Sequence, residues 1–260
     1  MLAHPDDETF GVGGTLIRCA KEGMEVHSLC LTQGEQGWAG PEDAPIVPRE
    51  LVGQTRAKEL EEAGRRMGLK SVTCLTYPDG GLAGVKEDYV VRDIVRWLRQ
   101  VRPDVVIAWG PDGGYGHPDH IAAGARAMRA IELAGIQRHE PEIGDHVHVK
   151  RCYRMVAAAE FVDKLSSVVP SFASYMETLA VKPERWTRDR LGAAIDITSV
   201  VDAKIHAMEA HATQSPDLVM WREARGKLPN LFMEETYVRA FPEPGGPPLE
   251  TDLFAALRKS

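Results

Sequence analysis

The chain has 260 residues, with 31 Lys and Arg against 38 Asp and Glu and a formal net charge of -7. This acidic balance excludes the basic face with which a nucleic-acid-binding protein neutralises phosphates. No apolar run approaches the roughly 18 residues of a membrane span, and the N-terminus lacks the basic and apolar regions of a signal peptide, so we expect a cytoplasmic protein without a membrane span.

Apolar runs and helical patterns alternate along the first half of the chain. Three apolar runs bounded by turn residues predict strands, at residues 25–32, 72–77 and 104–110. Four amphipathic patterns predict helices, at residues 15–22, 49–67, 88–100 and 117–133. Such alternation is typical of a parallel sheet with helices on both faces.

The second half gives weaker signals. Strands are predicted at residues 152–160, 193–198 and 236–241, helices at 200–211 and 217–225, and loops at 137–150 and over the tail FPEPGGPP. We therefore expect an α/β, Rossmann-like fold: a mostly parallel sheet flanked by helices on both faces, with a C-terminal elaboration. The length fits a single domain over residues 1–260.

The first strand is short. Only Met1 to Ala3 precede the motif HPDDE, so this strand is truncated or the natural start lies upstream. In a Rossmann-like strand order of 3-2-1-4, the first strand lies beside the fourth. The loop that carries HPDDE would then meet the loop PDGGYGHPDH, Pro111–His120, at the point where ligands bind such sheets.

These two loops contain the residue types of a metal site. Imidazole nitrogens and a carboxylate suit zinc in an open site with three protein ligands. In HPDDE the candidates are His4 and one of Asp6 or Asp7, and the other carboxylate would be free to act as a base. In GHPDH, Pro118 is a favourable first helical residue, which places His117 near the N-cap and His120 about one turn later. One of these histidines can bind metal while the other faces the substrate.

Seven motifs occur in order from residue 3 to about residue 214: AHPDDE, GVGGT, TQGEQG, RAKELEEAGRRMG, YPDGG, GHPDH and HATQ. Together they resemble the LmbE-like (PIG-L) family of zinc-dependent N-acetylglucosamine deacetylases. The resemblance implies one Zn²⁺ per chain, bound by His4, Asp7 and His120. It also implies that Asp6 is the general base and that His117 stabilises the oxyanion and protonates the leaving amine.

The resemblance further implies substrate contacts from Arg56, Asp79 and Glu35, each of which also has a structural interpretation. Arg56 can pair with Glu59 or Glu61 on its own helix, and Asp79 can cap the turn that follows it.

Other side chains near the predicted crevice have two open interpretations. Trp38, Trp109 and Tyr115 can stack on a sugar or belong to the core, and His211 can point into the site or lie at a helix C-terminus. Glu8 is expected to be an N-terminal helix charge or a partner of the metal ligands rather than a ligand.

The sequence thus predicts a zinc-dependent hydrolase that removes the acetyl group from an N-acetylglucosamine-type amide. Zinc would activate water and polarise the amide, and a protonated His117 would stabilise the oxyanion. The partner is then a small amino sugar, and family members are often homo-oligomers. Alternatives are a metal-dependent amidase acting on a non-sugar or conjugate amide, an iron-dependent oxygenase, a non-catalytic metal-binding protein, and a dinucleotide-binding protein suggested by GVGGT and Glu35.

Overall fold

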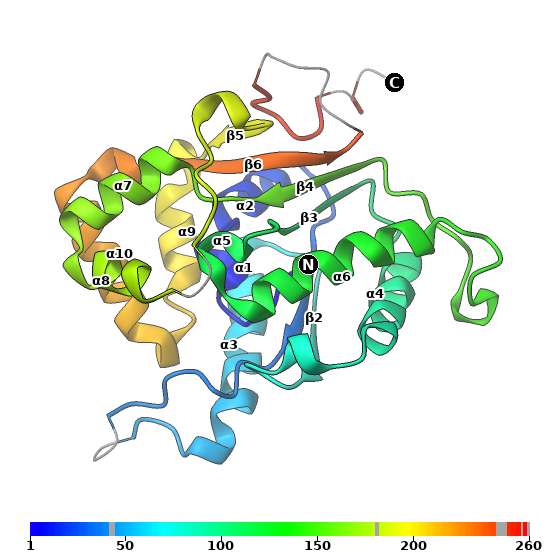
Figure 1. Ribbon diagram of the computed structural model, residues 1–260, viewed down its shortest axis with the longest axis horizontal. Coiled ribbons are helices and arrows are strands. Elements are labelled where there is room, and N and C mark those ends of the chain that lie inside the picture. Colours follow the sequence, from blue (N-terminus) through cyan, green and yellow to red (C-terminus); the bar gives the residue numbers. More distant parts are fainter. Residues whose placement is uncertain (42–44, 180–181, 243–248, 256, 259–260) are drawn as a thin grey trace.

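The computed structural model describes residues 1–41, 45–179, 182–242, 249–255 and 257–258 (Figure 1). Two sheets are formed in this part of the chain. Strands β1 (His27–Thr32) and β2 (Ser71–Tyr77) form a parallel pair. The second sheet has the order β3-β4-β6-β5; its strands are β3 (Val105–Trp109), β4 (Arg151–Met155), β5 (Ala193–Asp196) and β6 (Glu234–Phe241).

The first three residues lie between the two sheets and link them. Leu2 forms a parallel bridge with Cys30 of β1, and the N–H of Thr32 donates to the carbonyl of Ala3 over 2.9 Å. On the other side, the amino group of Met1 donates to the carbonyl of Ile107 in β3 over 2.7 Å. The spatial order is therefore β2, β1, residues 1–3, β3. If residues 1–3 are counted as the first strand, this is the predicted 3-2-1-4 arrangement.

The second sheet, which contains β3, β4, β6 and β5, is mixed rather than parallel. β3 and β4 are parallel, whereas β6 runs antiparallel to both β4 and β5. The predicted α/β fold is confirmed, and its parallel strands lie on the side where the two motif-bearing loops emerge.

Helices cover the sheet in two groups (Figure 1). α4 (Glu87–Val101) packs on α6 (Pro118–Ala134), whereas α2 (Gly13–Lys21) and α3 (Val52–Met67) pack against α9 (Val201–Met208). Two short helices, α1 (Asp7–Phe10) and α5 (Gly113–Gly116), directly follow residues 1–3 and the β3 strand end. The main core is formed between these layers and includes Leu29, Leu31, Ile94 and Leu98, all fully buried.

A further group of helices, α7 (Ala159–Val168), α8 (Pro170–Thr178) and α10 (Ser215–Lys227), lies at the left of Figure 1, away from α4 and α6. They have their own apolar cluster around Leu165, Val169, Ala224 and Phe232. These helices supply much of the predicted C-terminal elaboration. α7 and α8 were not predicted, and the strand expected over 152–160 is wrong beyond Met155. The apolar run that follows Met155 does not distinguish a strand from a helix start.

Smaller differences concern element ends. The predicted helix over 15–22 begins at Gly13, and the stretch 137–150 contains one short 3-10 helix, Pro141–Ile143. The other 3-10 helices are Arg49–Leu51, Leu82–Gly84, Arg188–Arg190, Thr198–Val200, Ala212–Gln214 and Pro229–Phe232. Most of the predicted tail loop, residues 243–248, lies outside the described residues. Within the described ranges, none of the helices has the length and apolar character needed to cross a bilayer.

Candidate active site

Side chains from the two predicted loops converge where residues 1–3 lie beside β3. His4 Nδ1 is 3.1 Å from His120 Nε2, and Asp7 Oδ1 is 3.2 Å from the same His120 nitrogen. His4 Nδ1 and Asp7 Oδ2 are 4.0 Å apart. All three residues are buried. Donor atoms bound to tetrahedral zinc at about 2.0–2.1 Å are about 3.4 Å from one another, so these spacings fit a small divalent ion.

The backbone holds Asp7 in this position. Asp7 is the first residue of α1, and its Oδ2 accepts hydrogen bonds from the N–H groups of Ala3 and His4 over 3.0 and 2.9 Å. The indole N–H of Trp109, at the end of β3, donates to the same oxygen over 3.1 Å. Burial opposes ionisation of Asp7, but His120 and His4 lower its pKa below the usual range. The carboxylate is therefore charged and fixed toward the two imidazoles.

The second nitrogen of each imidazole also has a partner. His4 Nε2 lies 3.1 Å from Asp79 Oδ1 and 3.2 Å from Asp119 Oδ2, and His120 Nδ1 lies 3.0 Å from the carbonyl oxygen of Gly113. Metal-binding histidines commonly donate their distal N–H to a carboxylate or carbonyl in this way. Such bonds direct His4 Nδ1 and His120 Nε2 toward each other and toward Asp7.

Asp119 is the residue that the sequence interpretation missed. It is fully buried, and its carboxylate also accepts N–H groups from Gly80 and Leu82 over 2.7 and 3.0 Å. Burial opposes the charge on His4, but Asp119 and Asp79 raise the pKa of His4 to about 10 in the metal-free protein. The signal was available in HPDH, where an acid separates the two histidines.

The indole ring of Trp109 packs against the face of the His120 imidazole. Their rings are stacked with centroids 3.8 Å apart at an angle of 13°, and Trp109 is buried. A Cβ atom on Gly114 would lie only 2.7 Å from the Trp109 ring, and Gly114 has φ +76. Glycine thus allows α5 to close over the indole. Trp109 therefore holds two predicted ligands, Asp7 and His120, in addition to its place in the core.

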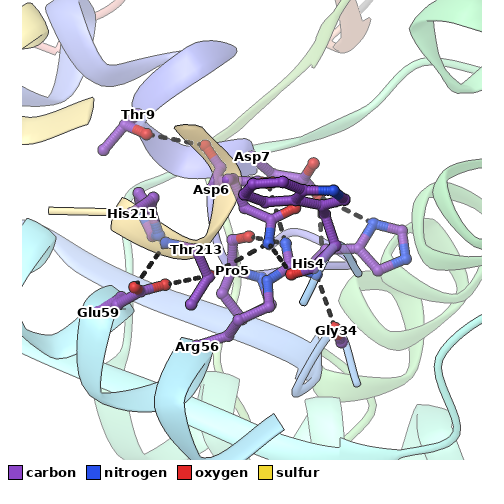
Figure 2. Close-up of polar contacts among 12 residues, drawn as sticks. His4, Pro5, Asp6, Asp7, Thr9, Gly34, Arg56, Glu59, His211 and Thr213 are labelled. Carbon is purple, nitrogen blue, oxygen red and sulfur yellow. Dashed lines mark hydrogen bonds and ion pairs between the residues drawn. The ribbon is translucent and has the colours of Figure 1, made fainter. Parts of the chain in front are cut away.

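Asp6 lies beside this centre in a strained backbone conformation, with φ 112. Its carboxylate accepts a hydrogen bond from Arg56 over 2.9 Å, and Arg56 also donates to the carbonyl groups of Pro5 and Gly34 (Figure 2). Burial raises the pKa of Asp6 to about 6, although the guanidinium of Arg56 opposes this shift. The group is thereby tuned toward the neutral pH range in which a general base operates.

A buried ion pair lies behind Asp6. Glu8 Oε2 accepts the N–H of Asp6 over 3.0 Å, and Glu8 Oε1 is 2.6 Å from His211 Nε2. Glu8 and His211 are 0 % and 1 % exposed. Burial alone would lower the pKa of His211, but Glu8 raises it. His211 therefore holds Glu8 in place, and Glu8 in turn binds the backbone of Asp6 in the HPDDE motif.

His117 is the fourth residue around the centre. Its ring centroid is 4.8 Å from that of His4 and 4.7 Å from that of His120. The three histidines could also form a ligand group, as could His4, Asp79 and Asp119. As N-cap of α6, His117 accepts the N–H of Asp119 at Nδ1 over 3.2 Å. Burial and the neighbouring imidazoles lower its pKa to about 4, so His117 is neutral and carries its proton on Nε2.

The residues expected to contact substrate face the protein. Arg56 pairs with Asp6 rather than with Glu59 or Glu61. Asp79 accepts the N–H of Gln36 over 2.8 Å in addition to its contact with His4, and Glu35 accepts the N–H of Asp79 over 2.8 Å. The structure brings Arg56 and Asp79 to the centre and places Glu35 one contact further out.

The glycine-rich turn does not offer a dinucleotide site. Its N–H groups at Gly14 and Thr15 donate to the buried carboxylate of Glu235 over 2.9 and 2.8 Å. A pyrophosphate would need these donors at the start of α2. The start of this helix is therefore already occupied.

A cavity of about 1100 Å³ reaches the centre at Asp6, Asp7, Trp109 and Tyr115. It extends between the sheet and the helices α7, α8 and α10. A ligand of considerable size can therefore approach the cluster of histidines and acids.

These features define a class of protein. It is an α/β protein with a buried His/Asp centre where the first strand lies beside β3, next to the Asp6 carboxyl with its raised pKa and to an open cavity. Residues 1–131 match the PIG-L family, described as GlcNAc-PI de-N-acetylase. A relative from Streptomyces avermitilis, named 1D-myo-inositol 2-acetamido-2-deoxy-alpha-D-glucopyranoside deacetylase, is 33% identical over 98% of this chain and 95% of the relative. The chain belongs to the PIG-L family.

Two solved structures share the fold. N,N'-diacetylchitobiose deacetylase from Pyrococcus horikoshii has a TM-score of 0.65 and 21% identity, covering 92% of this chain and 81% of that one. The 4-carboxy-2-hydroxymuconate hydratase GalB from Pseudomonas putida KT2440 has a TM-score of 0.64 and 21% identity, covering 93% and 95%. At these identities the similarity shows the fold alone. The curated relatives and the family membership confirm the predicted family and enzyme class, an N-deacetylase.

Proposed function

We propose that this protein is a zinc-dependent hydrolase that removes the acetyl group from an N-acetylglucosamine-type amide. The observation that carries the proposal is the convergence of His4 Nδ1, His120 Nε2 and the Asp7 carboxylate within 3.1 to 4.0 Å, beside a second acid, Asp6, that lines the cavity. The names of the curated relatives support an amino-sugar substrate.

The donor set fits one zinc ion per chain. His4, Asp7 and His120 would hold it, since two imidazoles and one carboxylate with satisfied distal nitrogens are typical ligands of catalytic zinc. When bound, the ion supplies Lewis acidity that polarises the amide carbonyl and lowers the pKa of water. His117 is not needed as a ligand, because its Nδ1 is engaged with the backbone at Asp119.

Asp6 accepts the proton of the attacking water in this proposal. The hydrogen bond from Arg56 orients its carboxylate, and the bond from Asp6 N–H to Glu8 fixes its backbone. A base with a pKa of about 6 is ionised at neutral pH and still able to take a proton.

His117 donates a hydrogen bond to the developing oxyanion. Its neutral form has the proton on Nε2, which lies on the ring opposite the nitrogen that caps α6. A neutral imidazole N–H is sufficient for this role, so the protonated His117 expected from sequence is not required at the start of the reaction.

Arg56, Asp79 and Glu35 remain the proposed substrate contacts. A cytoplasmic location and assembly into homo-oligomers also remain predictions.

The test is amine release from two panels, measured with zinc-loaded and chelated protein. One panel contains N-acetylglucosamine glycosides, and the other contains N-acetyl amides without a sugar. Zinc-dependent release from the first panel supports the proposal. Release from the second panel alone would establish the alternative, an amidase for non-sugar amides, and no release from either would contradict both.

A further inference from the structure

The cavity beside the His/Asp centre is much larger than an acetylated monosaccharide requires. Its volume of about 1100 Å³ exceeds the roughly 300–1,000 Å³ of pockets that enclose a whole drug-sized ligand. One end lies at Asp6 and Asp7, and the other lies among α7, α8 and α10. We refer to this far end, lined by Phe161, Phe172, Met220, Trp221 and Phe232, as the apolar chamber.

The wall of the apolar chamber is aromatic. Trp221 and Phe232 have ring centroids 3.8 Å apart, and Phe161 lies 5.7 Å from Phe232. Phe10 of α1 extends this surface toward the centre, with its ring 6.3 Å from that of Trp221. A continuous apolar path therefore leads from α1, which carries the predicted ligand Asp7, to the α7–α8–α10 group.

Three pairs of charged side chains along the cavity are engaged with one another. Lys204 Nζ lies 2.6 Å from Glu235 Oε1 and 5.0 Å from the Trp221 ring centroid. Lys164 pairs with Glu160 over 2.5 Å. Because these charges are already paired, they offer little to a polyhydroxylated group.

The pair formed by Arg188 and Glu234 completes this pattern. A polar substituent packed against the five side chains of the chamber would lose its hydration and gain few hydrogen-bond partners, which is unfavourable. An apolar substituent would instead exchange water for aromatic contacts.

We propose that the substrate carries an apolar alkyl or aryl substituent, which occupies the apolar chamber while the amide lies at the His/Asp centre. This inference rests on the proposed function and specifies its substrate class. It separates this chain from a relative whose name gives an inositol substituent, a polar group. The substituent is attached either at C1 of the sugar or as a longer acyl chain on nitrogen, in which case the acyl group removed is longer than acetyl. The experiment distinguishes these sources.

The experiment compares three substrates: methyl N-acetylglucosaminide, its hexyl glycoside, and the methyl glycoside bearing an N-hexanoyl group. Each buried methylene contributes about fourfold in binding at most, so we expect kcat/KM to rise at least tenfold for one of the two longer compounds. A gain with the hexyl glycoside assigns the chamber to the C1 substituent, and a gain with the N-hexanoyl compound assigns it to the acyl chain. Equal or lower kcat/KM for both would overturn the inference.

Two neighbouring residues of α10 provide a matched pair of variants. Met220 lines the chamber, whereas Val219 is 60 % exposed and does not. Met220→Ser should reduce the preference for the longer compound at least threefold, and Val219→Ser should leave that preference unchanged. An equal effect of both substitutions, in variants whose circular dichroism matches the parent, would count against the chamber.

Calorimetric titration of the same three compounds into metal-free protein separates the two proposals. Tighter binding of a longer compound supports the chamber even if none of the three is deacetylated, which would contradict the proposed function alone. Equal binding of all three would contradict the chamber, whether or not they are deacetylated.

Discussion

The backbone at Asp6 shows how the motif prepares the proposed general base. A non-glycine residue at φ 112 costs energy, and here Glu8 and Arg56 hold it from two sides. The strain directs the Asp6 carboxylate to the cavity while Asp7, one residue later, faces the histidines. Two adjacent acids thus acquire different environments, and the environments separate their pKa values.

Replacing the base tests this division directly. Asp6→Asn keeps the size of the side chain but cannot accept a proton, so kcat should fall about 10²- to 10⁴-fold. Bound metal should stay at one equivalent, because His4, Asp7 and His120 are unchanged. Amine release and elemental analysis of one preparation measure both quantities, with the exposed Asp145→Asn as the control. Full activity of Asp6→Asn would rule out its role.

Substitutions of the two histidines of HPDH should likewise have different effects on metal binding and turnover. His120→Ala removes a ligand and should lose stoichiometric metal, whereas His117→Ala should keep the metal and lose turnover. Elemental analysis after dialysis decides between the ligand group with Asp7 and the group of three histidines. Loss of metal from His117→Ala would show that His117 is a ligand.

The buried pair of Glu8 and His211 should contribute to the stability of the folded protein. His211→Ala would leave the Glu8 carboxylate buried without its partner, which costs about 3 to 5 kcal/mol. We expect this decrease in the free energy of unfolding in urea titrations. His206→Ala, at an exposed histidine of α9, is the matched control and should cause almost no change. Similar effects of the two substitutions would mean that the pair does not hold the motif.

Helix α3 positions Arg56 through its close packing on β2. A Cβ atom at Gly64 would lie 2.3 Å from Val72 Cγ2, so this helix can approach the strand only with glycine there. Gly64→Ala should destabilise the protein by about 1–3 kcal/mol and shift Arg56 away from Asp6.

A glycine of α10 provides the control for that prediction. Apart from its chain neighbours and the backbone of its own helix, a Cβ atom on Gly226 would meet no described atom within 4 Å, so Gly226→Ala should leave stability unchanged or raise it by up to about 1 kcal/mol. Thermal and urea unfolding of both variants measure the difference. A neutral Gly64→Ala would show that α3 can move without cost.

The paired motifs were predictable because local sequence and sheet topology suffice to bring them together. HPDDE follows the first strand and GHPDH follows β3, and their meeting depends only on strand order. The pairing of Glu8 with His211 behind them was not predictable, although each residue was singled out by itself. His211 lies 203 residues from Glu8, and its pairing depends on how α9 ends against α1.

The helices α7 and α8 could not be predicted from the sequence for a different reason. Their apolar residues are spread over a short run after β4, and only the cluster with α10 and Phe232 selects the helical state. The chamber depends on this cluster, so the feature that we connect with substrate preference was also the part of the fold that sequence patterns described least well.

A bound metal ion would make the stability of the whole molecule depend on the metal. Because His4 belongs to the N-terminal segment and His120 to α6, a bound ion cross-links two parts of the main core. Ligands that bind only the native state stabilise it. Chelation should therefore lower the thermal unfolding midpoint, and zinc should restore it. His120→Ala protein should show no such response; an equal response in that variant would place the ion elsewhere.

We propose that one ion at the His4–Asp7–His120 centre is required for deacetylation. The most direct measurement is a titration of chelated protein with zinc, from zero to two equivalents per chain, while acetate release from an N-acetylglucosamine glycoside is followed. We expect negligible release without zinc and a linear increase that ends at one equivalent. Full release by the chelated protein, or an increase that continues beyond one equivalent, would contradict it.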